Sequence, residues 1–391
     1  MNSNSVKNKL VRITTVPGSL SGLLSGQLKF MNQYYDVIGI SSEGDALNLV
    51  EQREGVRTIK VNMTRKLTPG KDLIALWRLV KVLKHENPQI VHTHTPKAGI
   101  IGMLASKITG VPHRLHTVAG LPLVEANGIK RIILNQVEKI TYACATKVYP
   151  NSYGLESIIL EHKFTDKKKL KVIGNGSSNG INTNLFNPEA IDDGQIHQVR
   201  TEHGLKTSDF IFIYVGRIVK DKGINELVSA FNKLNQKYKH IRLLLVGPKE
   251  SHLDPVSPET ESVIENNPAV ISTGWQNDVR PYFKASDALV FPSYREGFPN
   301  VVMQAAAMGL PSIVSDINGC NEIIETGING VIVPPKNDKK LYEAMEGFIT
   351  EPSKTKEMAQ NARKSILEKY DQNYVWNTIL KEYKQLNNET V

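Results

Sequence analysis

The sequence of 391 residues contains only two cysteines, Cys144 and Cys320. This number excludes a disulfide framework and a cysteine-based metal cluster, and it favours a reducing compartment. No uncharged apolar run is long enough to cross a bilayer, since AGIIGMLASKITGV is interrupted by Lys107. The first ten residues, MNSNSVKNKL, lack the apolar core of a signal peptide. We therefore expect a cytoplasmic protein that does not span a membrane.

Acidic residues are scarce in the first half of the chain. Residues 1–190 carry 25 Lys and Arg against 13 Asp and Glu, whereas residues 191–391 carry 23 against 26. A basic half suggests an anionic partner such as a membrane surface, a phosphorylated lipid or a nucleic acid, although a solvated lysine-rich surface explains the counts equally well. The basic half lacks the interleaved aromatic residues of an RNA-stacking surface, so we do not expect nucleic acid as a partner.

Short apolar segments with strand character alternate with helical patterns along the chain. The segment GINELVSAFNKLNQKY places apolar residues at a spacing typical of a helix that packs one face on a sheet. Such alternation forms parallel sheets covered on both faces. Two series predict an α/β fold of two doubly wound, Rossmann-like domains. The expected strands are VRITTV, DVIGIS, IVHTH, RLHTV, KVYPN and LKVIG, then FIFIYVG, IRLLLVG, AVISTG, ALVFPS, SIVS and GVIVP.

The predicted domains are residues 1–190 and 191–368, followed by a C-terminal helix within 369–391 that returns toward the first domain. The polar stretch 187–205 is expected to be the linker region. In doubly wound domains ligands bind at the carboxyl ends of the strands, so we expect the site in a cleft that the two domains face.

The segment YVGRIVKDKG follows an expected strand and precedes a helix. Arg217 offers a planar fork for phosphate oxygens, and Lys222 adds a compact positive charge. With a helix N-terminus beside them, these residues indicate a diphosphate site. A solvated basic turn is the simpler explanation for either residue alone.

A second anion-binding element is YREGFPNVVMQAAAMGLPSIVSD. Here a helix is predicted from Pro299 to Met308, with free amides at its start. Glu296 lies just before this helix, where a carboxylate can accept hydrogen bonds from ligand hydroxyls. Gln304 lies one turn beyond Asn300 on the same side of the helix. Together these groups indicate a nucleotide-sugar site, whereas Glu296 alone would be explained by its interaction with the helix dipole.

Other signals in the first half are weaker. The pair His92 and His94 has the alternating spacing of metal ligands, but no third ligand is near in sequence, and no metal is expected. Two amphipathic helices, in GKDLIALWRLVKVLKHE and IKRIILNQVEKITY, carry apolar residues beside lysine and arginine. They could lie on an anionic membrane or pack their apolar faces on the sheet.

These motifs together resemble the retaining GT-B glycosyltransferases of family GT4. The segment around Glu296 is similar to the E-x7-E signature of that family, and Gly216-Arg217 with Lys222 is similar to its phosphate-binding pair. The resemblance extends from TTVPGS through HTHTPKAG, LHTVAG and GNGSSNGIN to the C-terminal helix. The stretches SSNGINTNLF and VSDINGCNEII look most like bacterial members that extend polyprenyl-diphosphate-linked glycans.

The resemblance implies a nucleotide-sugar-binding second domain and an acceptor-binding first domain. Arg217 and Lys222 would stabilise the departing diphosphate in place of a metal ion, Glu296 would hold donor hydroxyls, and His116 would face the sugar from the first domain. No protein nucleophile is implied. The remaining implied nucleotide-sugar contacts are Gly216, Gly247, Trp275, Gln276, Phe298, Pro299, Asn300, Val301 and Gln304. The loop Pro17, Gly18 and Ser19 would approach a phosphate or the acceptor.

The chain departs from the family pattern at Gln304, where the second glutamate of E-x7-E is expected. The predicted activity is transfer of a hexose or N-acetylhexosamine from a nucleotide sugar, UDP-linked by expectation, to a lipid-linked saccharide in bacterial surface polysaccharide synthesis. Attachment to the inner face of the membrane is an added expectation. The alternatives are a catalytically impaired nucleotide-sugar-binding scaffold, which Gln304 suggests, and a UDP-sugar 2-epimerase of the same architecture.

Overall fold

The computed structural model describes residues 7–66, 68–121, 123, 127–250 and 254–387. Residues 1–6, which belong to the N-terminal stretch MNSNSVKNKL, lie outside the described residues. The chain divides into two compact units, Met1–Gly180 with Asn373–Val391, and Ile181–Gln372. It therefore passes from one unit to the other twice.

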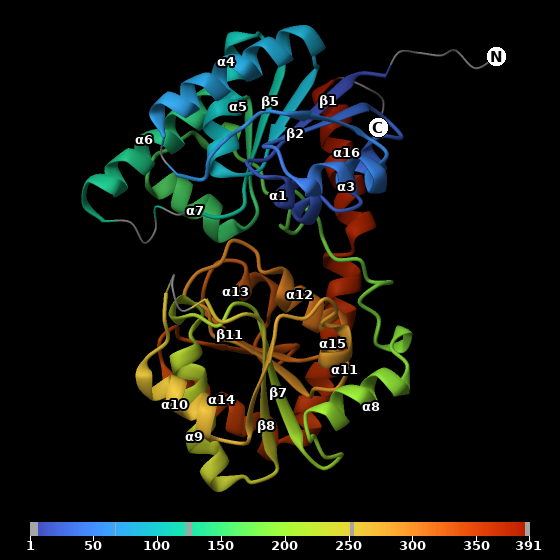
Figure 1. Ribbon diagram of the computed structural model, residues 1–391, viewed down its shortest axis with the longest axis vertical. Helices are drawn as coiled ribbons and strands as arrows, with labels where there is room; N and C mark the ends of the chain where they lie inside the picture. The colour runs from blue at the N-terminus through green and yellow to red at the C-terminus, as the bar shows by residue number, and fades with distance from the viewer. Residues whose placement is uncertain (1–6, 67, 122, 124–126, 251–253, 388–391) are drawn as a thin grey trace, which may run out of the picture. The chain divides into compact units, whose positions relative to one another are not determined.

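The first unit contains a parallel sheet flanked by helices (Figure 1). This sheet has six strands in the order β3-β2-β1-β4-β5-β6. Its strands are β1 (Lys9–Ile13), β2 (Asp36–Ser41), β3 (Arg57–Lys60), β4 (Ile90–Thr93), β5 (His113–Val118) and β6 (Lys147–Pro150). Its helices are α1 (Pro17–Leu23), α2 (Gln27–Met31), α3 (Asp45–Glu54), α4 (Pro69–Glu86), α5 (Pro96–Ile108), α6 (Gly128–Cys144), α7 (Tyr153–Glu161) and α16 (Gln372–Leu386).

Helices cover both faces of this sheet because alternate strand residues point to opposite sides. In β1, Val11 and Ile13 pack in a core that includes residues of α4, α5 and α7. Leu10 points the other way, into a second core with residues of α1, α2, α3 and α16. The C-terminal helix thus completes one face of the first unit.

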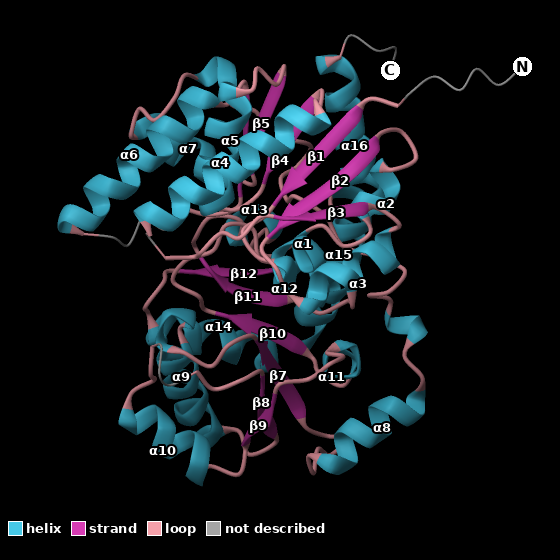
Figure 2. Ribbon diagram, turned by 45° about the horizontal axis from the view of Figure 1, so that its top comes forward, coloured by secondary structure: helices cyan, strands magenta, loops and turns pink. Residues whose placement is uncertain are grey.

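The second unit repeats this topology, with the strand order β12-β11-β10-β7-β8-β9 (Figure 2). Its strands are β7 (Phe210–Val215), β8 (Ile241–Val246), β9 (Val270–Gly274), β10 (Ala288–Phe291), β11 (Ser312–Ser315) and β12 (Gly330–Val333). Its helices are α8 (Asp193–Glu202), α9 (Ile224–Lys237), α10 (Pro258–Asn266), α11 (Arg280–Lys284), α12 (Asn300–Ala307), α13 (Cys320–Ile323), α14 (Asp338–Thr350) and α15 (Pro352–Lys369).

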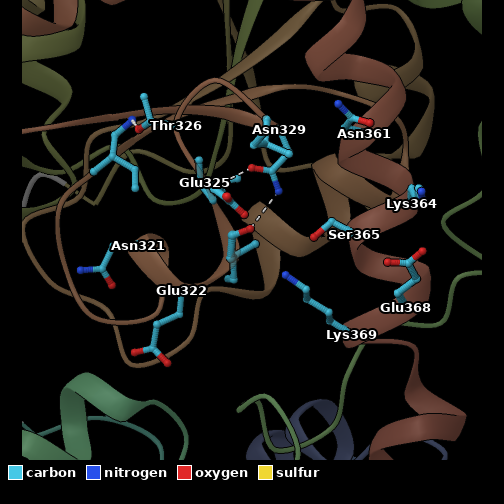
Figure 3. A pocket seen from close by; sticks show the side chains of 14 residues that line it. Asn321, Glu322, Glu325, Thr326, Asn329, Asn361, Lys364, Ser365, Glu368 and Lys369 are labelled. Carbon is cyan, nitrogen blue, oxygen red and sulfur yellow. Dashed lines mark hydrogen bonds between the residues drawn. The ribbon is translucent and has the colours of Figure 1, made fainter.

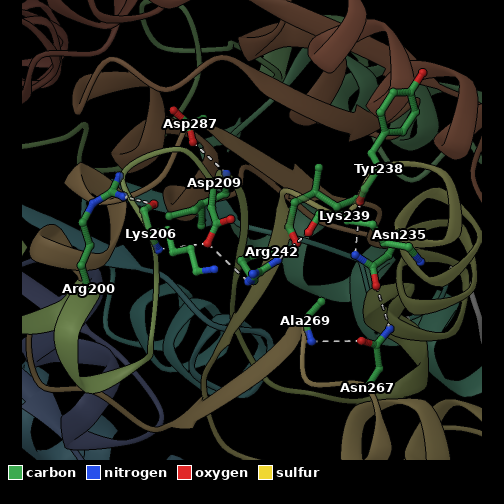
Figure 4. Close-up of polar contacts among 12 residues, drawn as sticks. Arg200, Lys206, Asp209, Asn235, Tyr238, Lys239, Arg242, Asn267, Ala269 and Asp287 are labelled. Atoms are coloured by element: carbon green, nitrogen blue, oxygen red, sulfur yellow. Dashed lines mark hydrogen bonds and ion pairs between the residues drawn. The ribbon is translucent and has the colours of Figure 1, made fainter.

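Polar side chains tie together the amino ends of the central strands in the second unit (Figure 4). Asp287 accepts a hydrogen bond from the Ile211 amide at 2.7 Å, and Asp209 pairs with Arg242 at 3.4 Å. Burial raises the pKa of Asp287. This edge is opposite the carboxyl ends of the strands, so we assign the network to stability.

The predicted fold class of two doubly wound parallel sheets is confirmed. Three local predictions were wrong. LKVIG, predicted as a strand, forms only an isolated bridge between Leu170 and Val148. The edge strand β3 was not predicted, because two of its four residues are exposed and the other two are only partly buried. The stretch 187–205 is not a linker, because it contains α8, which begins with a capping box made by Asp192 and Gln195 and contacts α11. Residues 181–190 also belong to the second unit.

Candidate functional site

The candidate site lies where the order of strands in the second sheet reverses direction. β7 is paired with both β8 and β10 at the centre of the sheet, and the chain continues outward from these strands in opposite directions. Ligands of doubly wound sheets bind at this switch point, beside the carboxyl ends of the strands. The loops that follow β7 and β10, residues 216–223 and 292–299, carry Arg217, Lys222 and Glu296.

Glycines allow these loops to approach each other closely. Gly223 has a φ of +71°, and a Cβ at this position would lie 2.1 Å from the Pro292 carbonyl oxygen. Gly247, the residue directly after β8, has a φ of +147°, and a Cβ there would lie 1.9 Å from the carbonyl oxygen of Gly216. Both glycines are therefore required by backbone conformation and by space.

Lys222 and Glu296 meet across the switch point. Lys222 Nζ lies 2.5 Å from Glu296 Oε1, although the residues are 74 positions apart in the sequence. Ser293 donates a second hydrogen bond, 3.0 Å long, to the same oxygen. The side chains of Lys222 and Glu296 are only 16 % and 19 % exposed. Among the described residues, both of these hydrogen bonds are made to Oε1 of Glu296. Sequence analysis missed Ser293, three residues before the acid.

Arg217 lies on the same loop as Lys222 and is paired with Glu250 at 3.1 Å. Its backbone carbonyl accepts a hydrogen bond from the hydroxyl of Tyr214. Burial raises the pKa of Tyr214; Glu296 adds to this rise and Arg217 opposes it. Arg217 thus shares a loop with Lys222, while its guanidinium pairs with Glu250 and the Glu296 carboxylate pairs with Lys222. Glu250 was not predicted from the sequence.

Helix α12 starts one residue later than predicted. Pro299, with φ −75° and ψ 112°, is its N-cap and has no amide hydrogen, so the free amides begin at Asn300 and Val301. The preceding Phe298 is buried, and Gly319 packs on the Gly297 carbonyl, where a Cβ would lie 2.5 Å away. Gln304 is partly buried one turn into the helix.

Trp275 and Gln276 follow β9, the strand at the sheet edge beyond β8. Trp275 is 66 % exposed, so its ring is accessible to a ligand. Gln276 donates a hydrogen bond from Nε2 to the Thr273 carbonyl at 2.9 Å and so stabilises its own turn.

His116 lies inside the first unit. It is 3 % exposed in the middle of β5, its Nδ1 is 2.7 Å from Thr93 Oγ1, and a Cβ on Gly99 would lie 2.5 Å from its ring. Burial lowers its pKa to about 4, although a hydrogen bond to Thr93 opposes this shift. The structure therefore does not support an open, sugar-facing position for His116, and we do not retain it as a catalytic residue.

The loop after β1 lies at the switch point of the first unit, between β1 and β4. Pro17 is buried in the first turn of α1, Gly18 is exposed, and the Ser19 amide donates to the Val16 carbonyl. Thr15 donates its amide to Thr95 Oγ1 at 3.0 Å, which joins this loop to the end of β4.

His92 and His94 have protein partners in place of a metal. His92 is hydrogen-bonded to Tyr383 at 2.6 Å and to Thr117 at 2.7 Å, and His94 accepts a hydrogen bond from Arg12 at 3.0 Å. In the part of the chain that the structure describes, no group of three or more His, Cys, Asp or Glu side chains could hold a metal ion.

A separate cavity of about 580 Å³ lies in the second unit between α15 and the turn that joins α13 to β12 (Figure 3). Asn329 braces the turn, with its side chain bonded to the Glu325 amide and the Ile323 carbonyl. None of the predicted site residues lines this cavity.

The chain is similar to known proteins over nearly its whole length. The model of glycosyl transferases group 1 matches residues 195–365, and that of the glycosyl transferase 4-like domain matches residues 34–176. The capsular polysaccharide biosynthesis glycosyltransferase CapM of Staphylococcus aureus is 32 % identical over 382 residues, which cover 96 % of this chain and 98 % of CapM. The UDP-Gal:alpha-D-GlcNAc-diphosphoundecaprenol alpha-1,3-galactosyltransferase of Escherichia coli is 28 % identical over 94 % of each chain. Anabaena HepE in complex with UDP has a TM-score of 0.78 at 18 % identity, covering 97 % of this chain and 100 % of HepE, a likeness of fold.

Proposed function

The chain belongs to the glycosyl transferases group 1 family, and we propose that it transfers a hexose or N-acetylhexosamine from a nucleotide sugar to a polyprenyl-diphosphate-linked saccharide. UDP is the proposed nucleotide, the anomeric configuration is retained, and the product enters a bacterial capsule or O-antigen type of polysaccharide. The Lys222–Glu296 contact at the switch point, with Arg217 on the same loop, is the observation that carries this proposal. The names of the S. aureus and E. coli relatives support the pathway and the acceptor class.

In this proposal the bond between the anomeric carbon and the donor phosphate oxygen breaks, and a bond to the acceptor oxygen forms on the same face of the sugar. Lys222 and Arg217 stabilise the negative charge that develops on the diphosphate. The acceptor proton moves to a donor phosphate oxygen, so no protein nucleophile is required. Arg217 exchanges Glu250 for the diphosphate when the donor binds.

Glu296 holds the donor sugar through its hydroxyl groups. Its Oε1 is held by Lys222 and Ser293, so Oε2 accepts from the ligand. The first amides of α12 and the Gln304 side chain bind the nucleotide. Because Arg217 and Lys222 perform the work of a metal ion, we propose that turnover continues in the presence of EDTA.

We also propose that the first unit attaches to an anionic membrane surface through α4 and α6. No helix in the described residues is long and apolar enough to span a bilayer. Instead, Trp77 on α4 is 61 % exposed, and Ile129 and Ile132 on α6 are 77 % and 61 % exposed. Other exposed apolar residues of these helices are Leu73, Ile74, Ile133 and Ile140, and exposed cations beside them are Lys71, Arg78, Lys81, Lys130 and Lys139. Apolar side chains among cations suit an anionic interface.

The activity is tested by incubating the protein with a panel of nucleotide sugars and a polyprenyl-diphosphate-linked saccharide, and identifying products by mass spectrometry. We expect one donor to extend the acceptor, and Glu296→Ala to abolish transfer while the protein stays folded. Donor binding without transfer or donor hydrolysis would favour the scaffold alternative.

Membrane attachment is tested by co-sedimentation with anionic liposomes. We expect salt-sensitive binding that Trp77→Glu or Ile132→Glu weakens. Leu367→Glu is the matched control, because Leu367 is 46 % exposed in the second unit. Equal binding by all three variants would refute the assignment of this surface.

A further inference from the structure

Arg12 is a fully buried arginine on β1 whose hydrogen-bonding partners are neutral. It donates from Nε to His94 Nε2 at 3.0 Å and from Nη2 to Gln27 Oε1. Its Nη1 is buried without a hydrogen-bond partner among the described residues. Because His94 Nε2 accepts, that imidazole carries its proton on Nδ1 and is uncharged.

No described carboxylate compensates the charge of Arg12. Burial lowers the pKa of Arg12, and a hydrogen bond with the Tyr383 hydroxyl opposes this shift only in part. Burial raises the pKa of Tyr383, so this group remains a neutral phenol at neutral pH. Burial also holds the pKa values of His92 and His94 well below their ordinary value. An arginine remains protonated under these conditions, and buried charges in proteins are normally paired.

A small cavity of about 10 Å³ lies beside the guanidinium. Its polar lining includes Thr117, Asn151, Ser177 and Ser178, together with Arg12 and His94, and contains no carboxylate. This volume is the space in which the centre of a water-sized sphere can lie. It is large enough for one small molecule or ion. The guanidinium, the Asn151 amide and the serine hydroxyls of this lining are hydrogen-bond donors, whereas the Thr117 hydroxyl is already hydrogen-bonded to His92.

We propose that this cavity binds one small monovalent anion, of the size of chloride, against Nη1 of Arg12. The anion supplies the missing negative charge, whereas a water molecule would satisfy only the hydrogen bond. This inference concerns the first unit and is independent of the proposed transferase activity.

The proposed anion would stabilise the attachment of the C-terminal helix. Gln27, which accepts from Arg12, donates from Nε2 to the Ser178 carbonyl at 2.9 Å and to Asn179 Oδ1 at 3.0 Å. Trp376 of α16 donates to the same Asn179 oxygen at 2.7 Å. A ligand that binds only the folded state stabilises it by mass action, so halide should raise the melting temperature of the protein.

The direct test uses crystals of the full wild-type chain grown in sodium bromide. We expect an anomalous bromide peak within hydrogen-bonding distance of Arg12 Nη1. A water molecule at this position, with no anomalous signal, would overturn the proposal.

The second test compares melting temperatures in bromide and in gluconate, which is too large for the cavity, at equal ionic strength. We expect the wild-type Tm to rise with bromide and to saturate, and Arg12→Met to remove this dependence. Arg114→Met is the matched control in the same unit, because Arg114 donates to the Cys144 and Val111 carbonyls and should leave the response intact. The proposal would be overturned if the wild-type Tm showed no saturable difference between bromide and gluconate. It would also be overturned if both variants lost the bromide dependence of Tm to the same extent. If Arg12→Met does not fold, the crystallographic test decides.

Discussion

The two proposed cations occupy different environments, and this difference leads to a prediction with two readouts. Lys222 is 16 % exposed and contacts Glu296, whereas Arg217 is 43 % exposed and pairs with the partly exposed Glu250. We expect Lys222→Met and Arg217→Met to reduce kcat by similar factors, about 10²–10³, because each removes one preorganised charge from the transition state. Their effects on stability should differ.

The stability difference follows from what each substitution leaves behind. Lys222→Met leaves the Glu296 carboxylate largely buried with Ser293 as its remaining partner, which should lower the free energy of unfolding by about 1–3 kcal/mol. Arg217→Met breaks a solvated pair, which is worth about 1 kcal/mol or less. In a domain of this size, each kcal/mol corresponds to a change of about 2–4 °C in Tm.

Both quantities can be measured on the same preparations. Turnover is followed with the donor and a lipid-linked acceptor, and stability by denaturant unfolding monitored by circular dichroism. A folded Lys222→Met protein with the wild-type kcat would refute the role of the cation. A larger stability loss in Arg217→Met than in Lys222→Met would refute the reasoning from burial.

Gly223→Ala should lower the free energy of unfolding by about 1–3 kcal/mol from backbone strain alone, and overlap with the Pro292 carbonyl should lower it further. The measurement is denaturant unfolding. Gly55→Ala is the control, because Gly55 has a similar φ of +65° but open space around it. Gln304→Glu should lower the donor KM and leave kcat unchanged, because a charged acceptor binds hydroxyl groups more strongly; a collapse of kcat in steady-state assays would contradict this. Burial holds the pKa of His116 at about 4, against an ordinary value of 6.5. Between pH 4 and 6.5 the unfolded chain therefore binds more protons than the folded protein, so the free energy of unfolding should fall as the pH drops through this range. His116→Asn should make this dependence shallower in urea titrations at several pH values, and an unchanged slope would contradict the burial argument.

Much of the fold could be predicted because the strands are short apolar runs between helical patterns, and the comparisons confirm the predicted family. Local patterns could not predict α8, whose polar sequence resembles a linker, or β3, which is half exposed. Arg217, Lys222 and Glu296 were chosen by residue type and resemblance, but the Lys222–Glu296 contact depends on β7 and β10 becoming neighbours. Nothing in the local sequence VRITTV shows that Arg12 is buried without a carboxylate partner among the described residues, because its partners lie on α2, on α16 and directly after β4.

The double passage of the chain between its units affects the order of folding during synthesis. The first unit needs Val375, Ile379, Leu380 and Tyr383 of α16 to close one of its cores, yet the ribosome makes these residues after the entire second unit. Domains made early in synthesis commonly fold before later ones. Here the second unit is the one whose residues are all contiguous, so this core of the nascent first unit, which α1, α2 and α3 cover in part, stays incomplete until α16 has been made.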